Sequence, residues 1–352
     1  MGARNDKKGI AFTFPALFLL GFSIILPFLA AAVMTLTDQR MLSPNPTEFV
    51  GLDNYKRLLS IRVQSVPPVL DDAGTIQRDA EGNIRYVRSA PIERTSDGLP
   101  PYQELGVFSI GNSRYVVQVR DPIFWKALAN TFLFVLFVVP FQIGAALGLA
   151  LLVKNPILGR TAFRTFFFAP VVTSMVVVSI VWAFLYNENS GLINQILGVF
   201  AGGGVVAINW LGNETLALPA IALMSAWQGA GFQMIIILAG LQSIDEQLYE
   251  AARLDGASEW QQFRHVTLPG LKNTLTFVVV TTTIAAFSLF VQVDVMTQGG
   301  PNDATTTLIY HAVQSGFREQ DVAYGASVAV VYFLLVLGVA LIQRRIAGSA
   351  ER

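Results

Sequence analysis

Long apolar segments alternate with short polar ones along most of this chain. Six windows contain no Asp, Glu, Lys or Arg: residues 9–37, 127–153, 165–187, 215–244, 273–293 and 322–343. Each is long enough to cross a bilayer, because a transmembrane helix needs roughly 20 apolar residues. The pattern predicts an all-α polytopic membrane protein with six transmembrane helices.

The first window has an alternative interpretation, because basic residues precede its apolar run as they do in a secretory signal peptide. Its apolar run covers residues 10–36, whereas the hydrophobic region of a signal peptide has about 7–15 residues. Pro15 and Pro27 also lie inside it. We therefore interpret residues 1–37 as a cytoplasmic start followed by a retained first helix.

Basic residues predict the orientation, because cytoplasmic loops carry an excess of Lys and Arg. Four groups of three flank the windows on one side: Arg4, Lys7 and Lys8; Lys154, Arg160 and Arg164; Arg253, Arg264 and Lys272; and Arg344, Arg345 and Arg352. The short loops on the other side hold only Arg318. Both termini are predicted to be cytoplasmic, with residues 344–352 as the tail.

Composition agrees with the membrane class, since 14% of residues are charged and 53% are hydrophobic, against about a quarter charged in soluble domains. The chain has no cysteine and a formal net charge of zero. These values exclude disulfide bonds and a globally basic surface.

Residues 38–126 form a polar segment that the orientation places outside. Strand-like runs occur at residues 75–78, 84–87 and 113–119. They predict a small β-rich external module, at about residues 60–119, inserted between the first two helices. The alternative is a disordered or loosely packed loop, because this segment is also rich in proline.

The charged segment at residues 243–269 separates two apolar windows on the predicted cytoplasmic side. Ser243 and Glu246 have the spacing of a capping box, and so do Ser258 and Gln261. Gly256 lies between them and can end a helix in the left-handed conformation. The segment predicts two short helices bent about this glycine, with Pro269 before the next membrane helix.

Physical chemistry alone leaves two interpretations of this segment: an amphipathic connector on the bilayer surface, or a docking surface that offers Leu248, Tyr249 and Leu254 to a partner. The sequence resembles the EAA signature of binding-protein-dependent ABC importer permeases at Glu250, Ala251, Ala252, Asp255, Gly256, Ala257, Leu268 and Pro269. The resemblance implies that these residues form a coupling helix, which sits in a groove of an ATPase subunit.

Further segments resemble the carbohydrate, maltose-type branch of the same family. They are residues 49–55 (FVGLDNY), 121–131 (DPIFWKALANT), 159–170 (GRTAFRTFFFAP), 191–194 (GLIN), 239–244 (AGLQSI) and 297–301 (TQGGP). Asp245 and Asn273 depart from the pattern, because the family often has proline there. The resemblance implies the type I importer permease fold for residues 127–343, and contact of the external module with a binding protein.

A sugar path needs hydrogen-bonding groups inside the bundle, because an unpaired hydroxyl stripped of water costs about 1–3 kcal/mol. Helical spacing places Ser225, Gln228, Gly229 and Phe232 on one face. The resemblance implies that they border the sugar site together with Thr282 and Ser288. The alternative for Gln228 is hydrogen bonding between helices, which we also expect for Thr281 and Thr283.

The chain has no ATP-binding loop of its own, since none of its six lysines follows a glycine as GK[ST] requires. The resemblance implies two ABC ATPase subunits that carry ATP and Mg, a second permease subunit that is more often homologous than identical, and an external binding protein. No catalytic residue, cofactor or metal is expected in this chain. The sugar would pass by alternating access, and a maltose- or trehalose-like disaccharide or other small oligosaccharide is expected.

Two other functions remain open. An importer of another solute such as glycerol 3-phosphate would favour basic residues facing the path, and no Lys or Arg lies inside a predicted span. A membrane-embedded enzyme or scaffold would need an acid–base or metal cluster. The only histidines, His265 and His311, are predicted to lie on opposite sides of the membrane, in the coupling surface and in an external loop.

Overall fold

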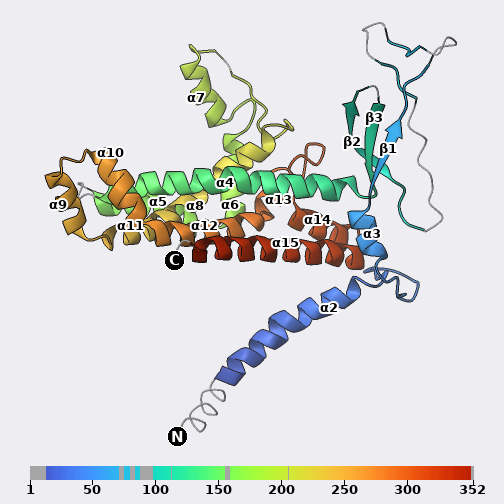
Figure 1. The fold of residues 1–352 in the computed structure, drawn as a ribbon, viewed down its shortest axis with the longest axis horizontal. Coiled ribbons are helices and arrows are strands. Elements are labelled where there is room, and N and C mark those ends of the chain that lie inside the picture. The colour runs from blue at the N-terminus through green and yellow to red at the C-terminus, as the bar shows by residue number, and fades with distance from the viewer. Residues whose placement is uncertain are drawn as a thin grey trace. The chain divides into compact units, whose positions relative to one another are not determined.

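The computed structural model describes residues 13–70, 75–79, 84–87, 98–111, 113–154, 159–204 and 206–349. Within these residues the chain forms helices, three π-helical turns and one small sheet (Figure 1). The helices are α2 (Leu26–Met34), α3 (Asp53–Leu59), α4 (Pro122–Lys154), α5 (Arg160–Val172), α6 (Met175–Leu185), α7 (Leu192–Phe200), α8 (Ala217–Gln242), α9 (Glu246–Leu254), α10 (Glu259–Gln262), α11 (Leu268–Gly270), α12 (Lys272–Phe287), α13 (Val291–Met296), α14 (Leu308–Val313) and α15 (Val322–Ser349). The π turns are η1 (Gly21–Ile25), η2 (Phe263–Thr267) and η3 (Gln314–Arg318).

Four unbroken helices are long and apolar enough to cross a membrane: Thr13–Met34, Pro122–Lys154, Ala217–Gln242 and Val322–Ile346. Two helix pairs meet the same criteria together but are bent. Thr161–Val172 and Met175–Leu185 meet at 101°, and Glu259–Gly270 and Lys272–Phe287 meet at 67°. The chain is therefore a mostly helical membrane protein with four to six spans, which confirms the predicted fold class.

Two of the predicted windows are not continuous helices. In the window 165–187, Thr173 and Ser174 have extended backbones between α5 and α6. In the window 273–293, α12 ends at Phe287, and α13 begins at Val291. Hydropathy could not indicate either break, because the interrupting residues carry no charge.

By internal contacts the chain divides into two units. One comprises Met1–Trp125 and His311–Tyr332, and the other comprises Lys126–Tyr310 and Phe333–Arg352.

The first unit contains an antiparallel sheet with strand order β1-β3-β2 (Figure 1), formed by β1 (Ile61–Val66), β2 (Gln103–Ile110) and β3 (Ser113–Val119). The predicted β-rich module is confirmed, and its strand at 113–119 matches β3. The other two predictions were wrong about position: residues 75–78 and 84–87 contribute only isolated bridges, such as Arg78 with Ile84. The residues between these two runs lie mostly outside the described residues.

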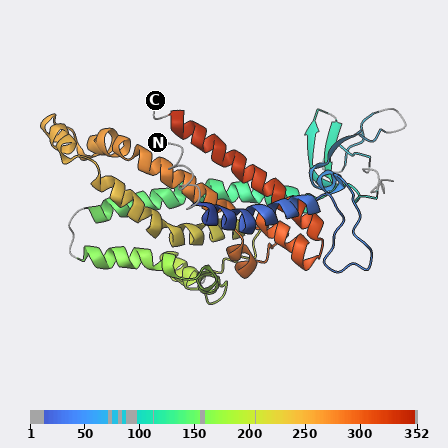
Figure 2. The same ribbon diagram turned by 90° about the horizontal axis from the view of Figure 1, so that it is seen from below.

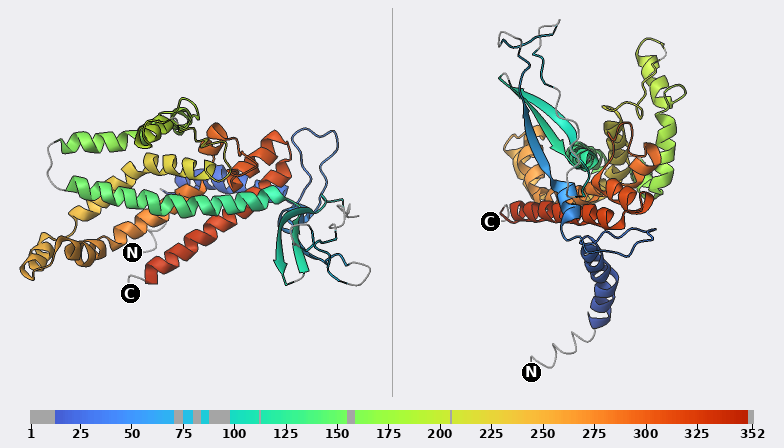
Figure 3. Two further views of the ribbon diagram at one scale, coloured as in Figure 1. Left: turned by 90° about the horizontal axis from the view of Figure 1, so that it is seen from above. Right: turned by 90° about the vertical axis from the view of Figure 1, so that its right-hand side faces the viewer.

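The second unit is a helical bundle in which α8 contacts both α5 and α12. In Figures 2 and 3, α4, α8 and α12 run alongside one another, with α5 on a flank. One apolar core joins α4, α8 and α12 through buried Ala146, Ala150, Met234, Ile237 and Val278. The small alanines of α4 allow the larger side chains of α8 to fill the space between the helices.

Two glycines of α8 permit close helix contacts in this bundle. A Cβ at Gly231 would overlap the backbone carbonyl of Phe167 in α5, and a Cβ at Gly240 would lie 2.5 Å from the Thr274 hydroxyl in α12. By contrast, Gly144 in α4 has nothing within 4 Å of its Cβ position. Gly231 and Gly240 of α8 therefore allow close helix contacts that Gly144 of α4 does not make.

Candidate functional site

Helix α9 ends two residues before the bend at Gly256, and its N-terminal cap differs from the one predicted. Asp245 is the N-cap, and its Oδ1 accepts the Gln247 backbone N–H at 3.0 Å. Ser243 instead donates its hydroxyl to the Gly240 carbonyl in α8 at 2.8 Å. The predicted capping box of Ser243 and Glu246 was wrong, because this hydroxyl bonds back to the preceding helix.

The left-handed stop at Gly256 is confirmed, with a φ of 76°. The Gly256 N–H donates to the Arg253 carbonyl at 3.1 Å, and the Ala257 N–H donates to the Ala252 carbonyl at 2.9 Å. These two bonds form a Schellman motif. The bend between the two helices is therefore built into the backbone at this glycine.

The second helix begins with the predicted capping box. The Ser258 hydroxyl accepts the Gln261 backbone N–H, and the Gln261 side chain accepts the Ser258 N–H at 2.7 Å. The chain continues through η2 and α11, which contains Pro269, and then bends into α12. The predicted coupling residues lie in α9, in the turn that follows it and in α11, at the end of the second unit (Figure 1).

Most of the predicted coupling residues are accessible. Exposed positions are Glu250, Ala251, Asp255, Gly256 and Pro269, and half-buried positions are Ala252, Ala257 and Leu268. Leu254 is 89% exposed and Leu248 is 54% exposed. The segment thus presents exposed apolar side chains beside acidic ones.

Tyr249, which was also expected to be available to a partner, is half-buried and makes two contacts within this chain. Its hydroxyl lies 2.9 Å from the Thr267 hydroxyl in η2, and the Lys154 Nζ lies 4.1 Å from the centre of its ring. Tyr249 therefore joins α9 to the end of α4 and to the following helix. The sequence gives no signal for this role, because both partners are distant in the chain.

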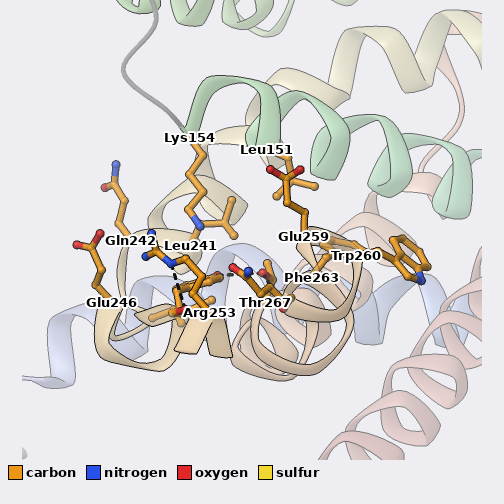
Figure 4. A pocket seen from close by; sticks show the side chains of 13 residues that line it. Leu151, Lys154, Leu241, Gln242, Glu246, Arg253, Glu259, Trp260, Phe263 and Thr267 are labelled. Carbon is orange, nitrogen blue, oxygen red and sulfur yellow. Dashed lines mark hydrogen bonds between the residues drawn. The ribbon is translucent and has the colours of Figure 1, made fainter. Parts of the chain in front are cut away.

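An open groove of about 1110 Å³ lies between α9, η2 and the ends of α4 and α8. Figure 4 shows Lys154 extending from α4 into this groove toward Arg253. Glu246 and Glu259 also line it, so both signs of charge are present. The predicted coupling residues lie outside this lining.

A smaller cavity of about 220 Å³ lies within the bundle of the second unit. It is lined by Phe134, Val138, Gln142, Val171, Met175, Ser225, Gln228, Gly229, Phe232, Gln233, Thr282, Ala285, Ala286, Leu289 and Gln292. None of these side chains is charged. Five of the six residues predicted for a substrate path are therefore brought together.

Ser288 is the sixth, and it lies outside this lining. It is the exposed C-cap residue of α12. The lining also includes Gln142, Gln233 and Gln292, which were not predicted. Gln233 lies one residue beyond Phe232 and could have been included on that basis, but only the packing of α4 and α13 brings Gln142 and Gln292 to the cavity.

Hydrogen bonding between helices, the alternative role considered for Gln228, Thr281 and Thr283, is found for two of these three residues. Gln228 lines the cavity and also donates from its Nε2 to the Pro170 carbonyl in α5, at 3.3 Å. Thr283 accepts a hydrogen bond from the Gln343 Nε2 in α15 at 3.0 Å. Thr281 instead donates to the Phe277 carbonyl of its own helix at 2.9 Å.

Residues 122–351 match the model of one protein family, described as the binding-protein-dependent transport system inner membrane component. The matched segment contains α4 to α15, including both the capped helices at 246–262 and the lining of the cavity.

Characterised relatives cover similar regions. The lactose transport system permease protein LacF of Rhizobium radiobacter is 35% identical over 239 residues, which are 66% of this chain and 79% of the relative. The trehalose/maltose transport system permease protein MalF of Thermococcus litoralis is 31% identical over 237 residues, 67% of this chain and 79% of the relative. A similar solved structure is a bacterial ABC transporter involved in the import of the acidic polysaccharide alginate. It has a TM-score of 0.60 at 21% identity and covers 66% of this chain and 81% of that chain, so the likeness concerns the fold alone.

Proposed function

Because this chain belongs to the binding-protein-dependent transport system inner membrane component family, we propose that it is the permease subunit of an ATP-driven importer that carries a carbohydrate. The observation that carries the choice of solute is the intrabundle cavity, whose lining has amides, hydroxyls and apolar groups and no charge. A neutral sugar offers hydroxyls to the amides and C–H faces to Phe134 and Phe232. The relatives named for lactose and trehalose/maltose transport support the same solute class.

The cavity volume favours a path shared with a second subunit. At about 220 Å³ it is smaller than the roughly 300–1,000 Å³ of sites that enclose a drug-sized ligand. A disaccharide would therefore occupy this cavity only in part. A second permease, homologous to this one, supplies the remaining surface in our proposal.

Coupling to ATP hydrolysis is assigned to the helices on either side of Gly256. Glu250, Ala251, Ala252, Asp255, Gly256 and Ala257, with Leu268 and Pro269, would seat this segment in an ATPase subunit. Tyr249 and its contacts with Lys154 and Thr267 would transmit the movement of that subunit to α4 and α12. ATP and Mg would be bound by two ATPase subunits, and no cofactor by this chain.

The proposed cycle is alternating access. A loaded binding protein docks outside, against surfaces that include the β1-β3-β2 sheet, and ATP draws the ATPase subunits together. The sugar enters the cavity and leaves on the cytoplasmic side when the ATPase subunits separate. Both termini are cytoplasmic in this arrangement, and the solute is a small oligosaccharide such as a maltose- or trehalose-like disaccharide.

The test measures the ATPase activity of the transporter assembled from this chain, its ATPase subunits, the partner permease and the binding protein. Lactose, trehalose, maltose and glycerol 3-phosphate would be added separately. The proposal expects one of the sugars to stimulate turnover, and Glu250→Ala to reduce that stimulation. Stimulation by glycerol 3-phosphate alone would reject the carbohydrate assignment, and failure to assemble with an ATPase would reject the coupling assignment.

A further inference from the structure

Three polar side chains that line the intrabundle cavity are almost fully buried, and two of them, Ser225 and Gln233, have a buried polar atom without a hydrogen-bond partner in the part of the chain that the structure describes. Gln142 in α4 and Gln233 in α8 are each 7% exposed, and Ser225 in α8 is 8% exposed. All three line the cavity. A buried polar group without a partner costs about 1–3 kcal/mol, so such groups are rare unless a ligand or water completes them.

Gln233 makes a hydrogen bond with only one of its two amide atoms among the described residues. Its Nε2 donates to the Thr282 hydroxyl at 3.2 Å, and this bond orients the side chain. Its Oε1 is buried and has no hydrogen-bond partner among the described residues, and neither has the Ser225 hydroxyl. The Oε1 atom can only accept a hydrogen bond, so the missing partner must be a donor such as a hydroxyl.

Gln142 reaches the same cavity because α8 has glycine at the facing position. A Cβ on Gly229 would overlap the Gln142 Nε2 and lie 2.9 Å from its Cδ. Gly229 thus leaves the space that the amide occupies. The position of this amide therefore depends on two helices: α4 carries Gln142, and α8 has a glycine without a side chain opposite it.

We propose that Gln142, Ser225 and Gln233 form a hydroxyl-binding subsite for the solute in the cavity, with Gly229 leaving the space that the Gln142 amide occupies. This inference rests on the proposed transport function and adds Gln142 and Gln233 to the path. Amides and a hydroxyl both donate and accept, which matches sugar hydroxyls. The lining offers no cation to neutralise a phosphate or carboxylate, so the subsite selects uncharged polyhydroxylated solutes.

The first test uses thiol labelling, because the chain contains no cysteine. Gln142→Cys would place a single thiol at the subsite, and Phe141→Cys would place one on the adjacent residue of α4, which is 55% exposed and outside the cavity lining. A charged methanethiosulfonate reagent is applied to the assembled transporter in membranes, and mass spectrometry of this chain measures labelling. We expect Cys at 142 to react at least fivefold faster than Cys at 141, and the sugar that stimulates ATPase to slow it at least fivefold.

The second test is sugar uptake by proteoliposomes that contain the whole transporter. Gln142→Leu and Gly229→Ala should each raise the KM for the stimulating sugar by about tenfold, with a much smaller change in kcat, while Phe141→Leu should change neither. Gly229→Ala keeps the Gln142 amide but displaces it, whereas Gln142→Leu removes it. The Gly229 variant therefore shows whether the position of the amide matters, and not only its polarity.

The outcomes of these two tests separate failure of the subsite from failure of the proposed transport function. Sugar-stimulated turnover with an unchanged KM in both cavity variants would overturn the subsite and leave the transport function standing. Equal labelling of the two cysteines would overturn the subsite even if no tested sugar were transported. Turnover stimulated only by glycerol 3-phosphate would reject the carbohydrate function and the subsite together.

Discussion

The Nε2 atom of His311 lies 2.9 Å from the Oδ2 atom of Asp121. His311 is 5% exposed and lies in α14, so the prediction that it belongs to an external loop was wrong. The same Asp121 oxygen accepts the Tyr324 hydroxyl, and the other accepts the Phe124 N–H at 2.9 Å. One carboxylate thus joins the start of α4 to α14 and α15.

These contacts predict how the stability of the protein depends on pH. Burial alone would raise the pKa of Asp121, but the hydrogen bonds and charge of His311, with the bonds from Tyr324 and Phe124, outweigh it and lower the pKa to about 2. Because the folded-state pKa lies below the unfolded value of 3.8, the stabilisation is fully present above about pH 4. It is lost as the pH falls toward 2, and amounts to roughly 2 kcal/mol.

Asp121→Asn should therefore lower the unfolding temperature at pH 7 in detergent and weaken its dependence on pH between 4 and 2. Thermal unfolding followed by tryptophan fluorescence measures both. The control is Asp53→Asn, since the ion pair that Asp53 makes among the described residues is with exposed Lys56 at the surface, and such pairs contribute little. An Asp121 variant as stable as the control would contradict the prediction.

Gly231→Ala is expected to destabilise the bundle by about 2 kcal/mol or more, because the new Cβ would collide with the rigid Phe167 carbonyl. The matched control is Gly144→Ala in α4, where a Cβ meets nothing within 4 Å. That change should be neutral or stabilising by up to about 1 kcal/mol, since alanine favours helix over glycine. Yield of monodisperse protein and thermal unfolding would be compared, and equal effects would refute the role of Gly231.

Gly256→Ala is expected to reduce sugar-stimulated ATPase activity about fivefold or more. The left-handed backbone costs a residue with a Cβ roughly 1–2 kcal/mol, so the bend between α9 and α10 becomes less populated. Gly256→Asn should retain more activity, because asparagine tolerates this conformation better. Identical losses in the two variants would indicate that the backbone angle is not the cause.

Tyr249→Phe should weaken the attachment of α9 to η2. The variant loses the hydroxyl contact with Thr267 but keeps the ring beneath Lys154, so the expected loss is about 1 kcal/mol. We expect ATPase subunits to bind normally while transport per ATP hydrolysed falls. Co-purification together with uptake and ATPase assays would detect this, and an unchanged ratio would count against the proposed transmission.

The sequence by itself determined the membrane class, the approximate spans and the bend at Gly256. These depend on local properties: apolar length, the charge of short loops, and the conformational freedom of one glycine. The capping box of Ser258 and Gln261 was predictable for the same reason, since both partners lie within one helical turn.

Only the tertiary structure decided the breaks in two spans, the contacts of Tyr249 with Lys154 and Thr267, and the pairing of Asp121 with His311. These side-chain contacts join segments that are distant in the chain, and 190 residues separate Asp121 from His311. The lining of the cavity includes residues of both kinds, predictable and not predictable from the sequence. Helical spacing identified Ser225, Gln228, Gly229 and Phe232, whereas Gln142 reaches Gly229 only through the packing of α4 against α8.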